Sequence, residues 1–210
     1  MGNKQNKNEK KHFNENIYIE SINELKKDKN SRNKDKDRYK FNILFIGESD
    51  IGAKTSLIKR LIEGKFIELK EQEKRYEKCE YLFFEKEDKK IILYLIDTNG
   101  KKERRNFVND YFQNADCIII GYDVTNKQSF QEAIDYWYKK VQELSKTNLI
   151  YLLGNKIDLQ GDIKVKEEEA KIFTESKNIK YYPISVKNNI NINEFLYDLK
   201  ANLDIDKHII

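Results

Sequence analysis

Two patterns of hydrophobic and polar positions alternate along most of the chain: short apolar runs, and longer segments with helical spacing. The apolar runs predict six strands, at residues 41–46, 81–84, 91–96, 117–122, 149–153 and 181–184. Helical spacing predicts helices over residues 55–63, 129–144, 165–173 and 192–203. The second and third strands are joined by a short polar link and predict a hairpin. Strands that alternate with helices predict an α/β sandwich with a mostly parallel six-stranded sheet and flanking helices, which binds ligands at the carboxyl ends of its strands.

Residues 1–38 differ from the rest, because Lys, Asn, Asp and Glu dominate them. They hold 11 basic and 7 acidic residues, whereas residues 39–210 hold 29 of each sign. The whole net charge of +4 therefore lies in this segment, and a domain-wide nucleic-acid surface is excluded. We predict a disordered basic extension over 1–38, one domain over 39–203 and a short tail over 204–210. Apolar residues between Phe13 and Leu25 have helical spacing, so a short amphipathic helix for a partner or membrane surface is the alternative to a solvated tail.

Cysteine content and apolar run lengths limit the compartment. Cys79 and Cys117 both lie in apolar runs, which excludes a disulfide scaffold and a cysteine-based zinc site and fits a reducing cytosol. No run approaches the ~20 apolar residues of a membrane span. The sequence ends without a cysteine for prenylation, and Asn6 stands where an acylation signal on Gly2 requires Ser or Thr. We expect a cytoplasmic protein, with any peripheral attachment to an endomembrane made by other means than a C-terminal prenyl group.

The loop after the first predicted strand, GESDIGAKT at residues 47–55, has the parts of a phosphate-binding loop. Glycines let successive backbone N–H groups wrap phosphates, a lysine binds the outer phosphates, and a hydroxyl at the helix N-terminus binds Mg²⁺. Ala53 separates the second glycine from Lys54, so a plain glycine-containing turn is the alternative. Asp97 and Gly100 follow the third strand, where a carboxylate can bind Mg²⁺ and a glycine N–H a terminal phosphate.

Two later strand ends carry groups suited to a purine base. The segment Asn155-Lys156-Ile157-Asp158 follows one strand, and the carboxylate of Asp158 can accept from both N1–H and the 2-amino group of guanine. Ser185-Val186-Lys187 follows the last strand and can add a backbone N–H for the guanine oxygen. Each motif alone is compatible with a polar loop. Their joint occurrence, in order and each at a strand end, points to guanine-nucleotide binding.

Residues 39–203 resemble the small GTPase superfamily and, within it, the Rab family. The resemblance rests on the motifs above, on Tyr122-Asp123-Val124-Thr125-Asn126 with Ser129-Phe130, and on Trp137. It implies a P-loop three-layer sandwich and a GTP/GDP switch of vesicle traffic that requires Mg²⁺ and hydrolyses GTP. Effector and regulatory proteins would bind through residues 66–80 and 97–112, and no nucleic-acid partner is expected.

The resemblance also implies roles for individual residues. Lys54 would hold the β- and γ-phosphates, Thr55 and Asp97 the Mg²⁺, and Phe66 would pack against the purine. Lys54 and Lys101 stand at catalytic positions. The implied nucleotide contacts are Gly47, Asp50, Ile51, Gly52, Ala53, Lys54, Thr55, Ser56, Phe66, Gly100, Asn155, Lys156, Asp158, Ser185, Val186 and Lys187.

The chain departs from the family where GTP is sensed and hydrolysed. Ala53 falls at the second loop glycine if the spacing is counted back from Lys54, and otherwise is an insertion. Thr98 is the only Ser or Thr between Ser56 and Thr125, so the first switch lacks its Mg²⁺-binding threonine. Lys101 replaces the water-positioning glutamine, and an ammonium has no acceptor for a water proton. We therefore expect slow hydrolysis; a pseudo-GTPase interaction scaffold is the alternative, and an ATP-using P-loop enzyme is third.

Overall fold

The computed structural model describes residues 38–49, 54–64, 66, 78–86, 89–98 and 108–203. Six strands form one sheet in the order β2-β3-β1-β4-β5-β6. They are β1 (Arg38–Ile46), β2 (Lys78–Lys86), β3 (Lys89–Asp97), β4 (Cys117–Asp123), β5 (Ile150–Asn155) and β6 (Lys180–Pro183). Only the β2–β3 pair is antiparallel among these neighbours. The predicted hairpin and the mostly parallel six-stranded sheet are therefore confirmed.

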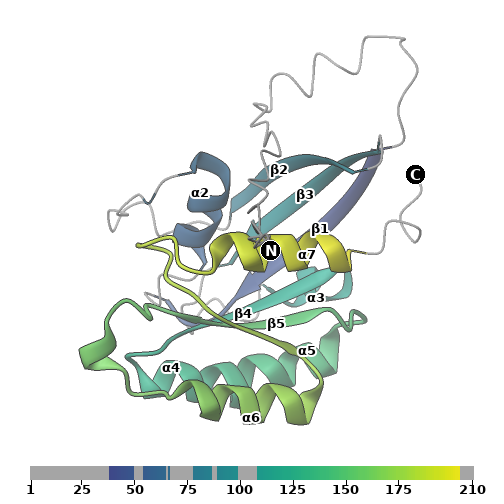
Figure 1. Cartoon of the computed structure of the whole chain (residues 1–210). Coiled ribbons are helices and arrows are strands. Elements are labelled where there is room, and N and C mark those ends of the chain that lie inside the picture. The colour runs from purple at the N-terminus through teal and green to yellow at the C-terminus, as the bar shows by residue number, and fades with distance from the viewer. Residues whose placement is uncertain are drawn as a thin grey trace, which may run out of the picture.

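Helices cover both faces of the sheet, as Figure 1 shows. They are α2 (Thr55–Glu63), α3 (Asn109–Gln113), α4 (Lys127–Glu132), α5 (Tyr138–Leu144), α6 (Glu167–Lys177) and α7 (Ile192–Asn202). Buried side chains of α2 and α7 pack in one hydrophobic cluster, and those of α3 to α6 pack in a second cluster on the other face. These two clusters confirm the predicted α/β sandwich of three layers.

Strand β1 shows why the central strands read as continuous apolar runs. Phe41, Ile43 and Phe45 belong to the cluster under α2 and α7, whereas Leu44 and Ile46 belong to the opposite cluster. A strand covered on both faces requires apolar side chains at successive positions. Because β1 pairs in parallel with β3 and β4, the ends of all three strands come to the same edge.

Helix α2 follows the first loop and ends where the sequence predicts. Its residues Leu57, Ile58 and Leu61 are buried on the face of the helix that packs on the sheet. Gly64 has a φ of 69° and donates its backbone N–H to the Arg60 carbonyl at 2.9 Å. A left-handed residue after the last turn is the conformation that glycine adopts most easily, so Gly64 fixes the end of this helix.

The predicted helix over 129–144 is a helical stretch with a different internal structure. It begins at Lys127, because the side-chain oxygen of Asn126 accepts from the backbone N–H of Gln128 and of Ser129. A π-helical turn, η3 (Ala133–Trp137), joins α4 to α5 and carries the buried Trp137. Helical periodicity alone does not reveal such a turn.

Some predicted boundaries are displaced, and two short elements were not predicted. The helix expected from residue 165 begins at Glu167, because the backbone N–H of Val165 donates to the carbonyl of Val124, which directly follows β4. The helix extends to Lys177, where Asn178 at a φ of 52° ends it. The last strand is Lys180–Pro183 rather than 181–184. Helix α3 and the 3-10 turn η4 (Gln160–Asp162) are too short for a periodic pattern.

Two tyrosine hydroxyls meet above β5. Tyr122 Oη lies 3.2 Å from Tyr181 Oη, and a Cβ added at Gly154 would lie 2.7 Å from the former. Burial raises the pKa of Tyr122 and raises that of Tyr181 to about 12. Both hydroxyls therefore stay protonated at neutral pH, and their packing requires a residue without a side chain at position 154.

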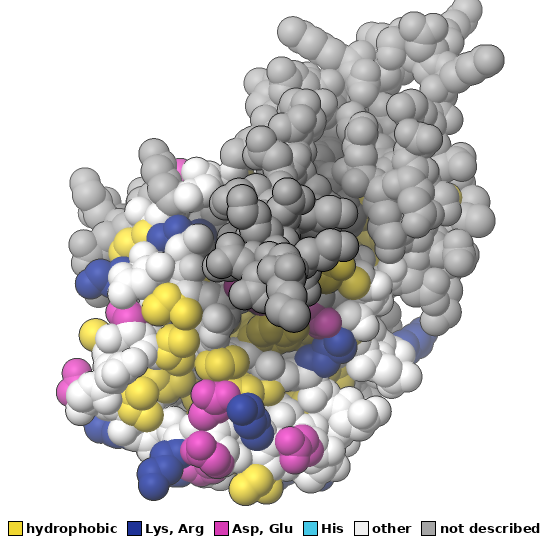
Figure 2. Space-filling model, in the orientation of Figure 1, with side chains coloured by type: hydrophobic (Ala, Val, Ile, Leu, Met, Phe, Trp, Pro, Cys, Tyr) yellow, Lys and Arg dark blue, Asp and Glu magenta, His cyan; other side chains and the backbone are white. Residues whose placement is uncertain are grey.

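The surface is mixed in character. On the face shown in Figure 2, described basic and acidic side chains lie among hydrophobic ones. Among the described residues, none of the helices has the length and apolar content that crossing a bilayer demands. The predicted basic extension and tail lie outside the described residues, apart from Arg38, which begins β1.

Candidate functional site

The carboxyl end of β1 leads into the first group of predicted site residues. Gly47 is buried and has a φ of 138°, a conformation that favours glycine. Lys54, at the start of α2, is only 6% exposed, and its ammonium donates to the Gly47 carbonyl at 2.9 Å and to that of Glu48. The end of β1 thus places two carbonyls on a buried cation at the edge of the sheet, and a buried cation of this kind suits an anionic ligand.

The predicted metal ligands touch each other. Thr55 Oγ1 donates to Asp97 Oδ2 at 2.5 Å, although the two residues are 42 positions apart. Asp97 reaches this position because it ends β3 opposite Phe45 of β1. A hydroxyl and a carboxylate oxygen are hard ligands of the type that Mg²⁺ prefers, so this pair fits the ion that the family implies.

Thr98, which follows Asp97, forms a hydrogen bond to β1. Its hydroxyl is buried and donates to the carbonyl of Phe45 at 2.6 Å. This bond ties the end of β3 to the end of β1. The Thr98 hydroxyl therefore stabilises the edge of the sheet.

The two predicted base-binding motifs form one bonded unit. Asn155 is 3% exposed, and its Oδ1 accepts from the backbone N–H of Val186 at 3.1 Å. Ser185 Oγ donates to Asp158 Oδ1 at 2.6 Å and accepts from the backbone N–H of Asn188. The structure therefore brings the ends of β5 and β6 together and fixes the Asp158 carboxylate at their junction.

Lys156 lies in this unit with an unusual backbone and a fixed side chain. Its φ is 71°, and its ammonium forms an ion pair with Asp123 at the end of β4. The sequence places an acidic residue directly after an apolar strand, but this pairing was not predicted. A through-space contact over 33 positions has no local signal.

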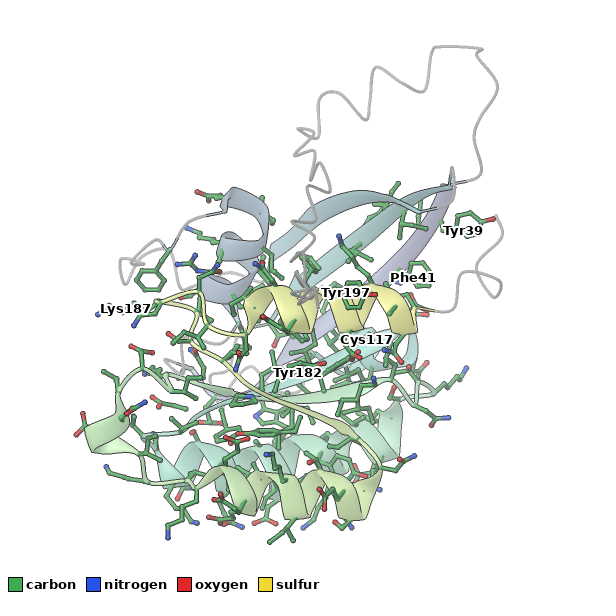
Figure 3. All side chains as sticks on the ribbon, viewed as in Figure 1. Tyr39, Phe41, Cys117, Tyr182, Lys187 and Tyr197 are labelled. Carbon is green, nitrogen blue, oxygen red and sulfur yellow. The ribbon has the colours of Figure 1, made fainter. Side chains whose placement is uncertain are left out.

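Arg60 was also missed. Its Nη2 donates to the carbonyl of Lys187 at 2.9 Å, so the last turn of α2 holds the loop between β6 and α7. Figure 3 shows Lys187 in that loop. The helix that follows the phosphate loop is thereby bonded to the loop predicted to bind the base.

The remaining predicted residues divide into two groups. Ser56 is buried within α2, and Phe66 is 37% exposed, so Phe66 is not a core residue. The others lie outside the described residues: Asp50, Ile51, Gly52, Ala53, Gly100 and Lys101. Of the predicted partner-binding segments, residues 67–77 and 99–107 also lie outside them.

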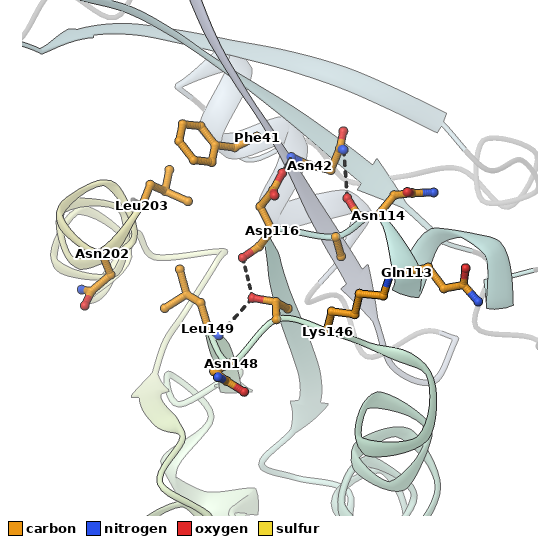
Figure 4. A pocket seen from close by; sticks show the side chains of 12 residues that line it. Phe41, Asn42, Gln113, Asn114, Asp116, Lys146, Asn148, Leu149, Asn202 and Leu203 are labelled. Carbon is orange, nitrogen blue, oxygen red and sulfur yellow. Dashed lines mark hydrogen bonds between the residues drawn. The ribbon is translucent and has the colours of Figure 1, made fainter. Parts of the chain in front are cut away.

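A cavity of about 540 Å³ lies at the opposite edge of the sheet (Figure 4). Residues 113–116 and 146–149, which precede β4 and β5, form much of its wall. Its polar groups largely bond to one another: Asn42 Nδ2 donates to the Asn114 carbonyl, and Thr147 Oγ1 donates to that of Asp116. None of the predicted site residues lines it, so the candidate site remains the carboxyl edge.

The Ras family profile matches residues 42–204. Rab-21 of Mus musculus is 31% identical over 166 residues, which cover 77% of this chain and 72% of the relative. Rab-13 of Rattus norvegicus is 31% identical over 169 residues, and human Rab-30 is 28% identical over 166 residues. Each of these two alignments covers 78% of this chain and 79% of the relative.

Proposed function

This chain belongs to the Ras family, as a Rab-like small GTPase, and we propose on that premise that it binds GTP and GDP with Mg²⁺ as a molecular switch in vesicle traffic. The observation that carries the proposal is the convergence of three groups on one edge of the sheet. These are the buried Lys54, the Thr55–Asp97 pair, and the bonded unit formed by the ends of β5 and β6. Each group suits a different part of one nucleotide.

Different residues bind different parts of the nucleotide. Lys54 binds the outer phosphates, and Thr55 and Asp97 hold Mg²⁺, which when bound offsets the negative charge of the phosphates. Asp158 accepts from the two guanine donors that adenine lacks. The N–H of Val186 already donates to Asn155, so we assign the guanine oxygen to the next backbone N–H, that of Lys187. The exposed ring of Phe66 packs on the purine.

The same proposal includes slow hydrolysis. Thr98, the one hydroxyl residue between Ser56 and Thr125, is bonded to the Phe45 carbonyl. Lys101 occupies the glutamine position in the sequence and cannot accept a proton from the attacking water. These two observations also favour the second candidate function, a scaffold that binds nucleotide weakly and interacts through residues 66–80 and 97–112.

The identity of the co-purified nucleotide tests the proposal. The full chain is purified in Mg²⁺, denatured, and its released nucleotides are separated by anion-exchange chromatography. We expect GDP or GTP at close to one per chain. Less than one-tenth of that amount would favour the scaffold, and ATP or ADP would favour an ATP-using enzyme. A Lys54→Ala variant purified in parallel should carry much less nucleotide, which shows that the bound fraction occupies the phosphate loop.

A further inference from the structure

The backbone of Lys156 is held in a conformation that lysine rarely adopts. Among the described residues, four that are not glycine have a positive φ, and the other three are Asn178, Asn189 and Asn191. Asparagine enters the left-handed region readily because its short polar side chain bonds locally, whereas a lysine side chain does not. The surroundings of Lys156 must therefore hold it at a φ of 71°.

Two backbone hydrogen bonds help to keep Lys156 in this conformation. The carbonyl of Lys156 accepts from the backbone N–H of Leu159 at 3.0 Å, which closes a turn. The next residue, Ile157, donates its N–H to the Ile184 carbonyl at 3.3 Å, so the turn is tied to the end of β6. The turn leaves one end of Lys156, the ammonium, to be fixed by a side chain.

The carboxylate of Asp123 holds the ammonium of Lys156 in place. Its Oδ2 forms the ion pair with Lys156 Nζ, and its side chain is 8% exposed against 33% for the lysine. Its Oδ1 accepts from the backbone N–H of Thr125 at 2.8 Å and from the Thr125 hydroxyl at 2.7 Å. The carboxylate is therefore held at both oxygens and presents a fixed negative charge to the lysine.

A comparison within the protein shows that this pair is not an ordinary surface contact. Lys127 and Glu169 also form an ion pair, but their side chains are 52% and 42% exposed. Exposed pairs contribute little because water screens them, whereas loss of one partner from a buried pair leaves an uncompensated charge. Of the two carboxylates, only that of Asp123 joins the buried end of a central strand to a predicted base-binding residue.

We propose that Asp123 is a positioning residue that acts through Lys156 to set how long a guanine nucleotide stays bound. The inference rests on the proposed function, since it assigns Lys156 to the base site. Asp123 anchors the lysine at the ammonium while the turn anchors it at the backbone. The aliphatic part between these two anchors then has little freedom and offers a fixed wall to the base.

The test is a double-mutant cycle on the rate at which the protein releases a fluorescent GDP analogue in Mg²⁺. Asp123→Asn keeps the shape and the acceptor for Thr125 but removes the charge, and release should become about 10- to 100-fold faster. Lys156→Met should also release faster. In the Lys156→Met background, Asp123→Asn should leave the rate unchanged or slow it, because the charge it removes no longer has a partner.

Glu169→Gln is the matched control, since it neutralises the carboxylate of the exposed pair; its release rate should stay within about twofold of the parent. Equal acceleration by Asp123→Asn in both backgrounds, or none in the parent, would overturn the inference alone. Absence of GDP binding by the parent chain would overturn the proposed function and the inference with it. If Asp123→Asn does not fold, Asp123→Glu, which keeps the charge but moves it by one methylene, replaces it in the same cycle. Faster release in the parent but not in the Lys156→Met background supports the inference. Equal acceleration in both backgrounds, or none in the parent, overturns it.

Discussion

Lys54 is the residue on which the proposed phosphate site depends most directly. Its ammonium lies buried against the backbone carbonyls of Gly47 and Glu48, which point two acceptors at its positive charge. A buried charge of this kind is costly unless it is paired, and phosphate oxygens would add the missing negative charge.

We expect Lys54→Ala to weaken the affinity for Mg²⁺-GDP about a hundredfold or more, because two phosphates lose a charged donor. Isothermal titration calorimetry on nucleotide-free protein measures this affinity. Lys177→Ala, which removes an exposed lysine from α6, should bind GDP as the parent does. Equal affinity in the Lys54 variant would show that the phosphates bind elsewhere.

Asp158 is the residue that we propose selects the base. Asp158→Asn keeps an oxygen for the Ser185 hydroxyl but replaces an acceptor toward the base with a donor. GTP binding should weaken while xanthosine triphosphate binding improves, so the preference between the two should shift by about tenfold or more. Competition against a fluorescent nucleotide measures both affinities in one assay, and an unchanged preference would contradict the assignment of this loop.

At the scale of elements, α2 connects both halves of the proposed site. Its first residues belong to the proposed phosphate and metal groups, and its last turn holds the Lys187 carbonyl through Arg60. A rigid helix that is bonded both to the end of β3 and to the loop between β6 and α7 keeps the distance between these two parts constant.

Arg60→Ala should therefore loosen the base loop without disturbing the phosphate loop. We expect GDP analogue release to accelerate about three- to tenfold, the effect of one lost hydrogen bond from a charged donor on a partly exposed surface. Stopped-flow fluorescence measures the rate, and Glu63→Ala, at an exposed position of the same helix, is the control. Release rates that match in the two variants would mean that the contact does not position the loop.

Helix α7 is attached to the sheet by a polar cluster as well as by its apolar face. The carboxylate of Asp198 accepts from Tyr151 Oη at 2.7 Å and from Lys180 Nζ at 2.9 Å. Burial raises the pKa of Asp198, but the bonds from Lys180 and Tyr151 outweigh it and hold the pKa below the ordinary value of 3.8. Because the folded-state pKa is the lower one, the stabilisation is present above pH 3.8 and is lost as the pH falls below it.

Asp198→Asn should lower the free energy of unfolding by about 1 kcal/mol at pH 7, since it loses the ion pair but keeps an acceptor for Tyr151. The difference from the parent should shrink as the pH is lowered into the range where the parent carboxylate is itself protonated. Urea unfolding at neutral and acidic pH measures both values. Glu194→Gln, at an exposed position of the same helix, should show no such pH-dependent difference.

For the whole molecule, a switch requires that GTP and GDP stabilise different states. A ligand shifts a conformational equilibrium only by its difference in affinity for the two states. The proposed Mg²⁺ ligands, Thr55 and Asp97, are in contact, but the hydroxyl of Thr98 is bonded to β1 and the sequence has no other threonine for the first switch.

We therefore expect slow single-turnover hydrolysis and little difference between GDP and GTP in amide exchange across residues 66–80. Lys101→Gln alone should recover little activity, because a glutamine cannot compensate for the missing threonine. Phosphate release and hydrogen exchange measure the two quantities. Rapid hydrolysis by the parent chain would show that another residue does the work of the threonine, and Glu73 and Tyr76 are the first positions to substitute.

Most of the architecture follows from local patterns. Residues 41–46 read as a buried strand because both faces of β1 are covered, and 55–63 reads as a helix that ends at Gly64 because that residue adopts a positive φ. The five-residue α3 and the π turn η3 were not predictable, since one is shorter than two helical turns and the other does not alter the apolar spacing.

The site is predictable only where its groups lie in motifs. Lys54, Thr55, Asn155 and Asp158 could be assigned from their places after strands, but Asp123 and Arg60 could not. Their partners lie 33 and 127 positions away, and contacts at such separations exist only once the sheet has assembled. The effect of Ala53 stays a prediction.

Gly154 restricts the order in which this sequence can evolve. A methyl group there would lie 2.7 Å from the Tyr122 oxygen, 2.9 Å from its Cζ and 3.0 Å from the Tyr181 oxygen. A lineage that acquires alanine at 154 first must pass through a destabilised ancestor, whereas a lineage that has already lost the hydroxyl by Tyr122→Phe needs only a small shift of the ring and of the Tyr181 hydroxyl. Alanine at this position is therefore a change that only an earlier mutation makes accessible, and descendants that carry it should also carry the first mutation.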